Sequence, residues 1–118
     1  MKRSALIGML TGLLGEVPVG AETLGYAAET VVDKPKVRVA KVAWSPGAKS
    51  PMRRVPIPRV VYFATAAKFE QTYADGRTRM VDHVEGDVDY LDQPDDNAEF
   101  SLTNAGNNTI RIVAIFLK

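Results

Sequence analysis

The chain has 118 residues and a mass of 12.9 kDa, with 46% apolar and 25% charged residues. This length provides one domain, and the composition is that of a globular protein rather than a disordered chain, a collagen or a coiled coil. Cysteine is absent and His83 is the only histidine, which excludes disulfides, thiolate nucleophiles and metal sites built on several imidazoles. The 15 Lys and Arg residues nearly balance the 14 Asp and Glu residues, so the net charge does not point to a nucleic-acid partner.

The N-terminus has the three parts of a secretory signal. Lys2 and Arg3 precede an uncharged, mostly apolar run over residues 4–14, and Val19-Gly20-Ala21 offers small residues for cleavage. The run is shorter than the ~20 apolar residues that span a bilayer, so stable membrane insertion is not expected. We therefore predict a signal peptide at residues 1–21, which would place the protein in the periplasm or outside the cell. The alternative is an N-terminal extension that packs on the domain of a cytoplasmic protein.

Beyond residue 30 the sequence has the pattern of an all-β protein. Short segments rich in Val, Ile, Phe, Tyr and Thr are separated by Pro, Gly, Asn and Asp. Asp75-Gly76, between two alternating segments, is typical of a hairpin turn. Strands are expected at Val37–Trp44, Arg59–Ala64, Lys68–Tyr73, Arg77–Val81, Asp87–Leu91, Glu99–Asn104 and Thr109–Leu117. Their spacing predicts a sandwich or barrel formed by residues 22–118.

A specific order of motifs runs from residue 37 to the C-terminus. Its parts are Trp44-Ser45-Pro46-Gly47-Ala48-Lys49-Ser50-Pro51-Met52, the Asp75-Gly76 hairpin, Glu85-Gly86-Asp87-Val88 and Asn104-Ala105-Gly106-Asn107. This order resembles the small single-domain cupins, in particular exported ones, and implies their double-stranded β-helix, a jelly-roll barrel. Small cupins commonly associate sheet to sheet. Because the last predicted strand is apolar on both faces, the resemblance also implies a homodimer.

The motif that binds metal in cupins is missing from this chain. In the family, G-x5-H-x-H is followed by Glu or Gln, and a second motif supplies one more His before an Asn. Counted from Gly47, the two histidine positions here are Arg53 and Val55, and the acidic position is Arg59 or Val60. Counted back from Asn104, the last histidine position is Phe100. None of these side chains is a metal ligand, so we predict a barrel without a metal or another cofactor. His83 lies just beyond a predicted strand and is expected at the surface.

An arginine cluster replaces the metal-binding motif. Arg53, Arg54 and Arg59 lie beside the former metal position, and guanidinium groups are matched to carboxylates and phosphates. We therefore consider a site for a small anionic ligand. Its expected binding residues are Arg53, Arg59, Tyr62, Tyr73 and Phe100, with Arg54 as a substitute for Arg59. The simpler interpretation is a solvated loop whose arginines pair with acids elsewhere, because Arg53 and Arg54 cannot both point inward from an extended segment.

Several functions are compatible with this pattern. The favoured one is a metal-free barrel that binds a small ligand or a protein partner. A metal-independent isomerase or cyclase would use Tyr62 or Tyr73 with a carboxylate such as Glu99, and a metal-dependent cupin would need ligands outside the motif. A scaffold with a filled barrel is the fourth possibility. The sequence identifies no catalytic residue, and an enzyme is therefore the less favoured function. A cavity of ligand size would exclude the scaffold.

Overall fold

The computed structural model describes residues 25–92 and 99–118, which form strands and no helix. The strands are β1 (Tyr26–Lys34), β2 (Val37–Trp44), β3 (Arg59–Phe63), β4 (Ala67–Tyr73), β5 (Thr78–His83), β6 (Val88–Leu91), β7 (Phe100–Asn104) and β8 (Ile110–Leu117). All seven strands expected from the sequence are present, and their ends differ from the expected ones by two residues at most.

The strand β1 was not expected. It pairs with β2 at the edge of its sheet, and a register shift between Thr30 and Val32 interrupts the pairing. Such a bulge reverses the alternation of faces along the strand, so the apolar period that marks a strand is lost. The expected signal peptide or extension at residues 1–21 lies outside the described residues, and export stays a prediction. In the described ranges, no helix has the length and hydrophobicity to cross a membrane.

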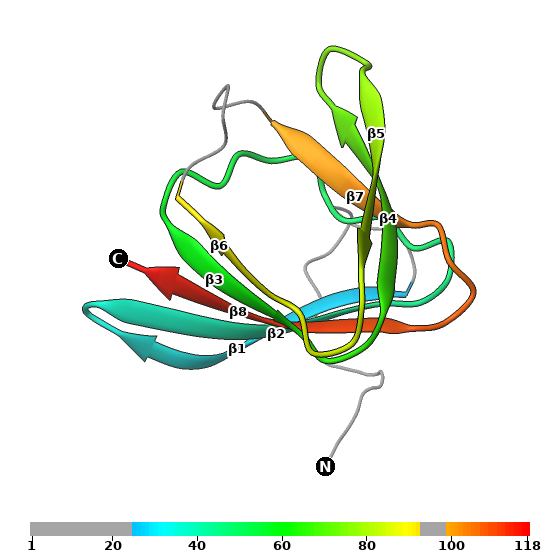
Figure 1. Ribbon diagram of the computed structural model, residues 1–118. Coiled ribbons are helices and arrows are strands. Elements are labelled where there is room, and N and C mark those ends of the chain that lie inside the picture. Colours follow the sequence, from blue (N-terminus) through cyan, green and yellow to red (C-terminus); the bar gives the residue numbers. More distant parts are fainter. Residues whose placement is uncertain (1–24, 93–98) are drawn as a thin grey trace.

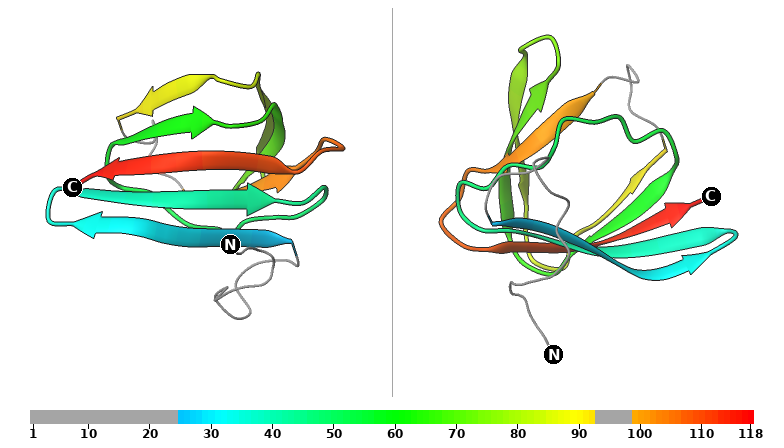
Figure 2. Two further views of the ribbon diagram at one scale, coloured as in Figure 1. Left: turned by 90° about the horizontal axis from the view of Figure 1, so that it is seen from below. Right: turned by 180° about the vertical axis from the view of Figure 1, so that it is seen from behind.

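The strands form two antiparallel sheets that enclose a common interior (Figure 1). The larger sheet has the order β1-β2-β8-β3-β6 and the smaller sheet has the order β5-β4-β7. Figure 2 shows the larger sheet face-on, with β8 at its centre, and from behind it shows the β2–β3 connection arching over the interior. Because side chains alternate between the two faces of a strand, each sheet turns every second residue toward the interior.

The connection between β2 and β3, residues 45–58, is held on β7. The Ser50 N–H donates to the Leu102 carbonyl at 2.9 Å, and Arg53 and Phe100 exchange two backbone hydrogen bonds of 2.9 and 3.0 Å. The Ser50 hydroxyl accepts from the Leu102 N–H at 2.9 Å. The connection therefore continues the smaller sheet as an irregular edge and places Arg53 at the rim of the interior.

Aromatic rings join the two sheets at one end of the interior. The Trp44 ring, 3% exposed, lies 5.3 Å from the Tyr26 ring and meets the Phe69 ring edge-on at 4.7 Å between centroids. Its indole N–H donates to the Leu102 carbonyl at 3.1 Å. Trp44 thus fixes the larger sheet against the smaller one by packing and by a hydrogen bond.

Candidate ligand-binding cavity

A cavity of about 630 Å³ lies between the two sheets. This volume is in the range of small-molecule sites, roughly 300–1,000 Å³. Most of its wall is apolar, with Trp44, Val61, Phe63, Phe69, Leu102 and Ile112 among the lining residues. Ala114 and Val61, paired across β8 and β3, are short side chains that line this cavity. These short side chains leave the middle of the larger sheet bare, and the filled scaffold is therefore disfavoured.

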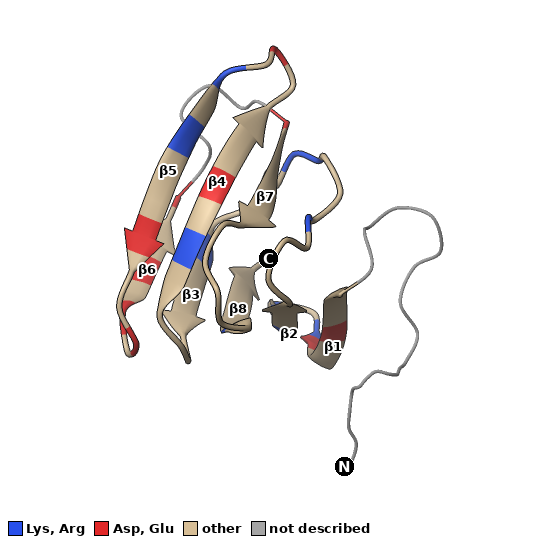
Figure 3. Ribbon diagram, turned by 90° about the vertical axis from the view of Figure 1, so that its right-hand side faces the viewer, with Lys and Arg blue, Asp and Glu red and all other residues tan. Residues whose placement is uncertain are grey.

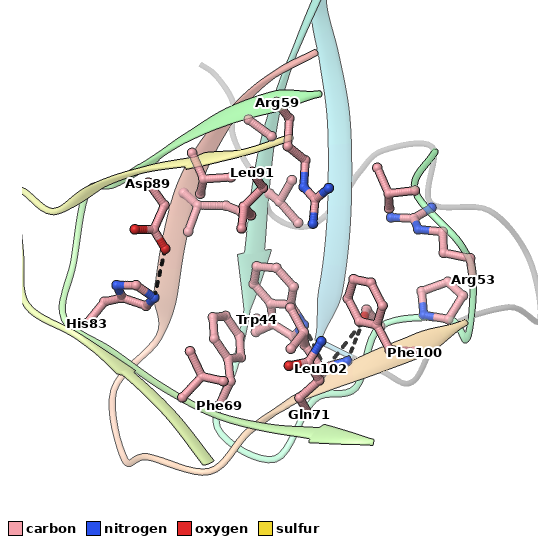
Figure 4. Close-up of a pocket in the computed structure, with 18 of the residues that line it drawn as sticks. Trp44, Arg53, Arg59, Phe69, Gln71, His83, Asp89, Leu91, Phe100 and Leu102 are labelled. Carbon is pink, nitrogen blue, oxygen red and sulfur yellow. Dashed lines mark hydrogen bonds and ion pairs between the residues drawn. The ribbon is translucent and has the colours of Figure 1, made fainter. Parts of the chain in front are cut away.

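Arg59 projects into this cavity from the start of β3 (Figure 4). Its register partners are Leu91 on β6 and Phe116 on β8, so its neighbours on the sheet are apolar. The Arg59 Nη1 atom is buried and has no hydrogen-bond partner, and no described carboxylate pairs with the group. Burial lowers the pKa of the Arg59 guanidinium, because removal from water penalises the charged form. The cavity therefore contains a desolvated cation without a counter-ion among the described residues.

Three further arginines line the rim of the cavity. Arg53 Nη2 donates to the Tyr26 hydroxyl at 3.0 Å, and Arg79 Nε donates to Gln71 Oε1 at 2.9 Å. Arg77 lies over the Tyr73 ring at 4.5 Å and pairs with Asp75, which is not a lining residue. Asp89 is the single carboxylate in the described lining. Along β4 and β5 acidic and basic residues alternate (Figure 3), and of these Arg79 and not Glu70 or Asp82 lines the cavity.

His83 and Asp89 lie at a different part of the cavity wall from Arg53 and Arg59 (Figure 4). The imidazole stacks on Phe63, with 3.9 Å between centroids and 15° between planes. Its Nδ1 lies 3.2 Å from Asp87 Oδ2, and its Nε2 lies 3.4 Å from Asp89 Oδ2. The His83 side chain is only 15% exposed, which corrects its expected surface position. The expected strand ended at Val81; the observed strand continues to His83 and pairs it with Ala67 on the inner face.

Four of the five expected binding residues line the cavity: Arg53, Arg59, Tyr73 and Phe100. The structure corrects the position of Tyr62, which lies 42% exposed on the outer face because Val61 and Phe63 take the inner face of β3. Arg59 belongs to a strand and is unpaired, so the solvated-loop interpretation does not describe it. Arg54 lies outside the lining, as the alternation with Arg53 predicted. A role of these residues in binding stays a prediction.

The expected metal positions face this cavity as well. Arg53, Val55, Arg59 and Phe100 are all lining residues, and Val60 is not. None of the four can ligate a metal. Both nitrogens of His83 already face carboxylates, and within residues 25–92 and 99–118 no group of three or more His, Cys, Asp or Glu could hold a metal ion. The described donor set does not fit the metal that the cupin fold implies.

Comparison with solved structures shows that the chain has the cupin fold, which confirms the predicted jelly-roll barrel. A cupin domain from Bordetella pertussis matches with a TM-score of 0.70 at 18% identity, over 80% of this chain and 94% of that chain. A polyketide cyclase from Streptomyces resistomycificus matches with a TM-score of 0.59 at 14% identity, over 82% and 67%. A sugar phosphate isomerase from Silicibacter pomeroyi matches with a TM-score of 0.57 at 17% identity, over 80% and 60%. No protein-family model and no curated protein matches the sequence.

Proposed function

We propose that this cupin-fold protein binds a small organic anion in its barrel, with Arg59 holding the anionic group. The observation that carries the proposal is the buried Arg59 Nη1 atom, which has no partner in a cavity of ligand size. A buried donor without a partner costs about 1–3 kcal/mol. A carboxylate or phosphate bound there would remove that cost and would form the charge-assisted hydrogen bonds to which a guanidinium is suited.

The charge around the cavity supports an anion over a neutral or cationic ligand. Four lining arginines face one lining carboxylate among the described residues, and the apolar wall lowers the local dielectric constant. Attraction between opposite charges is several times stronger in such surroundings than in water. The fold is also that of a sugar phosphate isomerase, and a sugar phosphate is itself a small organic anion.

An enzyme that uses a tyrosine and a carboxylate has less support. The Tyr73 ring lies against Arg77, and the lining carboxylate, Asp89, faces His83 rather than a tyrosine. Glu99 is not a lining residue.

The proposal is tested by isothermal titration with a panel of aliphatic and aromatic carboxylates, each paired with its primary amide. We expect at least one acid to bind, its amide to bind at least tenfold more weakly, and Arg59→Met to abolish binding of the acid. Arg111→Met is the matched control, because Arg111 is exposed on the outer face of β8. The proposal is overturned if no acid binds, or if the acid binds equally well to Arg59→Met.

We also propose that two copies of the chain pair through the outer face of the larger sheet. Its outward side chains form an apolar row at the half of the sheet away from Arg111: Val39, Val60, Tyr62, Val88, Val113 and Ile115. Tyr62 is 42% and Val88 is 63% exposed in the single chain. Because the row is continuous through the central strand β8, a second copy turned by a two-fold axis can cover it with the same residues.

The dimer is tested by measuring the mass in solution with light scattering. The unaltered protein should have twice the mass of the chain, and Ile115→Glu should reduce this to a single copy, because a buried unpaired carboxylate at the centre of the row is costly. Thr72→Glu, on the outer face of the smaller sheet, should leave the mass unchanged. A single-copy mass for the unaltered protein would contradict the proposal.

A further inference from the structure

The cavity wall beside His83 contains a hydrogen-bond acceptor that the described residues do not use. Asp89 Oδ2 faces His83 Nε2 at 3.4 Å, and Asp89 Oδ1 makes no hydrogen bond in the described part of the chain. Asp89 is a lining residue and its side chain is 42% exposed, so its carboxylate can be reached by a molecule in the cavity. Ionised carboxylates only accept hydrogen bonds, so Asp89 calls for a donor.

Neighbouring groups hold His83 in place beside Asp89. The imidazole is stacked on Phe63, and Asp87 Oδ2 lies 3.2 Å from His83 Nδ1 while accepting the Val84 N–H at 3.0 Å. The ring can therefore turn little, and its Nε2 stays directed at Asp89. The fixed imidazole gives the Asp89 carboxylate a partner on one side, which reduces the conformational freedom it loses when a ligand binds.

The spacing between Arg59 and Asp89 follows from the strand register. Arg59 pairs with Leu91. Asp89 precedes Leu91 by two residues on β6 and lies opposite Val61. Arg59 and Asp89 are thus diagonal neighbours on paired antiparallel strands, which lie roughly 7–8 Å apart. The inward side chains paired with these two positions, Leu91 and Val61, are apolar, and the rings of Trp44 and Phe69 also line the cavity (Figure 4). A molecule that reaches both groups must therefore be apolar in its middle.

The charges around Asp89 restrict the donor to a neutral one. A second anionic group would be repelled by Asp87 and Asp89. An ammonium group would enter a cavity lined by four arginines, which repel it. A hydroxyl group donates one hydrogen bond and brings no charge.

We propose that the cavity selects an organic acid with an apolar, ring-sized body and a hydroxyl group at the end opposite the acid. The acid group lies on Arg59 and the hydroxyl donates to Asp89, while the body packs on Trp44 and Phe69. This inference rests on the proposed function, because Arg59 is what holds the acid end. It adds the substituent by which the protein distinguishes one organic acid from another.

The test measures affinity by titration calorimetry for cinnamate, 3-hydroxycinnamate, 4-hydroxycinnamate and 4-methoxycinnamate. We expect one of the hydroxylated acids to bind about tenfold more tightly than cinnamate, which is typical of a hydrogen bond to a charged group. The methoxy compound should lose that gain, because it has no proton to donate. In Asp89→Leu the hydroxylated acid and cinnamate should bind with nearly equal affinity. The affinity for cinnamate itself should stay within about threefold of that of the unaltered protein.

The matched control is Asp82→Leu, since Asp82 lies on the outer face of β5 next to His83. It should keep the full preference for the hydroxylated acid. Asp89→Ala is a second variant that should behave as Asp89→Leu does. If acids bind with no preference for the hydroxyl, or if Asp89→Leu and Asp89→Ala retain the preference, the inference is wrong and the proposed function stands. If no acid binds the unaltered protein, the proposed function itself fails.

Discussion

Replacing Arg59 with methionine is expected to stabilise the ligand-free fold by about 1–3 kcal/mol, the cost of a buried donor that lacks a partner. Methionine keeps an unbranched side chain of similar reach, and its thioether packs against Leu91 and Phe116 without desolvating a charge. Urea unfolding measures the effect, and the dependence of the unfolding free energy on urea concentration should be unchanged. Arg111→Met, at an exposed position, should change stability by no more than about 0.5 kcal/mol.

The order of stabilities should reverse when an acid is bound. A ligand at one thousand times its dissociation constant stabilises the unaltered protein by about 4.1 kcal/mol, more than the roughly 1–3 kcal/mol that Arg59→Met gains without ligand, whereas the acid adds nothing to Arg59→Met. Unfolding curves of both proteins, each measured with and without the acid, therefore separate the destabilisation by the unpaired guanidinium from the stabilisation by the bound acid. If Arg59→Met destabilises the ligand-free protein, the guanidinium has a structural partner and the assignment of an anion site is wrong.

The sequence predicted the barrel because its strands carry strong local signals. The bounds of β2 were predicted to the residue, and Asp75-Gly76 marked the hairpin between β4 and β5. The cupin resemblance placed Arg53 and Phe100 on the cavity wall correctly, because the count from Gly47 and Asn104 runs through segments whose pairing on β7 fixes their register.

The faces of β3 could not be predicted from the sequence. Arg59, Val61 and Phe63 form one row, and Val60 and Tyr62 form the other. Both rows contain apolar and aromatic side chains, so hydrophobicity does not decide which row faces inward. Pairing with β8 decides it, because Val61 lies opposite the buried Ala114. Tyr62 was therefore assigned to the cavity, although it faces outward.

The sequence did not predict that His83 and Asp89 line the cavity, for two related reasons. His83 was expected at the surface because the strand was predicted to end two residues too early, and strand ends are the least certain part of such a prediction. Asp89 faces inward only through its pairing opposite Val61, which is a contact between strands far apart in the sequence. The cavity itself is lined by the short side chains of Ala114 and Val61, and the separate strands β8 and β3 must be aligned before these two residues lie side by side.

Asn104→Leu is expected to lower the free energy of unfolding by about 3 kcal/mol, because one buried and two partly buried backbone groups would lose their partners, at a cost of about 1–3 kcal/mol for a buried group and less for the others. Asn104 is 2% exposed, and its Nδ2 donates to the carbonyls of Trp44 at 3.1 Å and Asn108 at 2.8 Å. Its Oδ1 accepts the Gly106 N–H at 2.9 Å. The side chain thus ties the end of β2 to the turn between β7 and β8, and leucine can make none of these bonds.

The loss is large for a domain of this size, whose total stability is about 5–15 kcal/mol. Since Trp44 forms one wall of the cavity, Asn104→Leu should weaken acid binding as well as lower the midpoint of thermal unfolding, by about 4–8 °C for each kcal/mol. The control is Asn107→Leu, at an exposed position of the same turn, which should change stability by no more than about 0.5 kcal/mol. A loss below 1 kcal/mol for Asn104→Leu would mean that water or a shift of the turn replaces the amide, and that the end of the barrel is less rigid than its hydrogen bonds indicate.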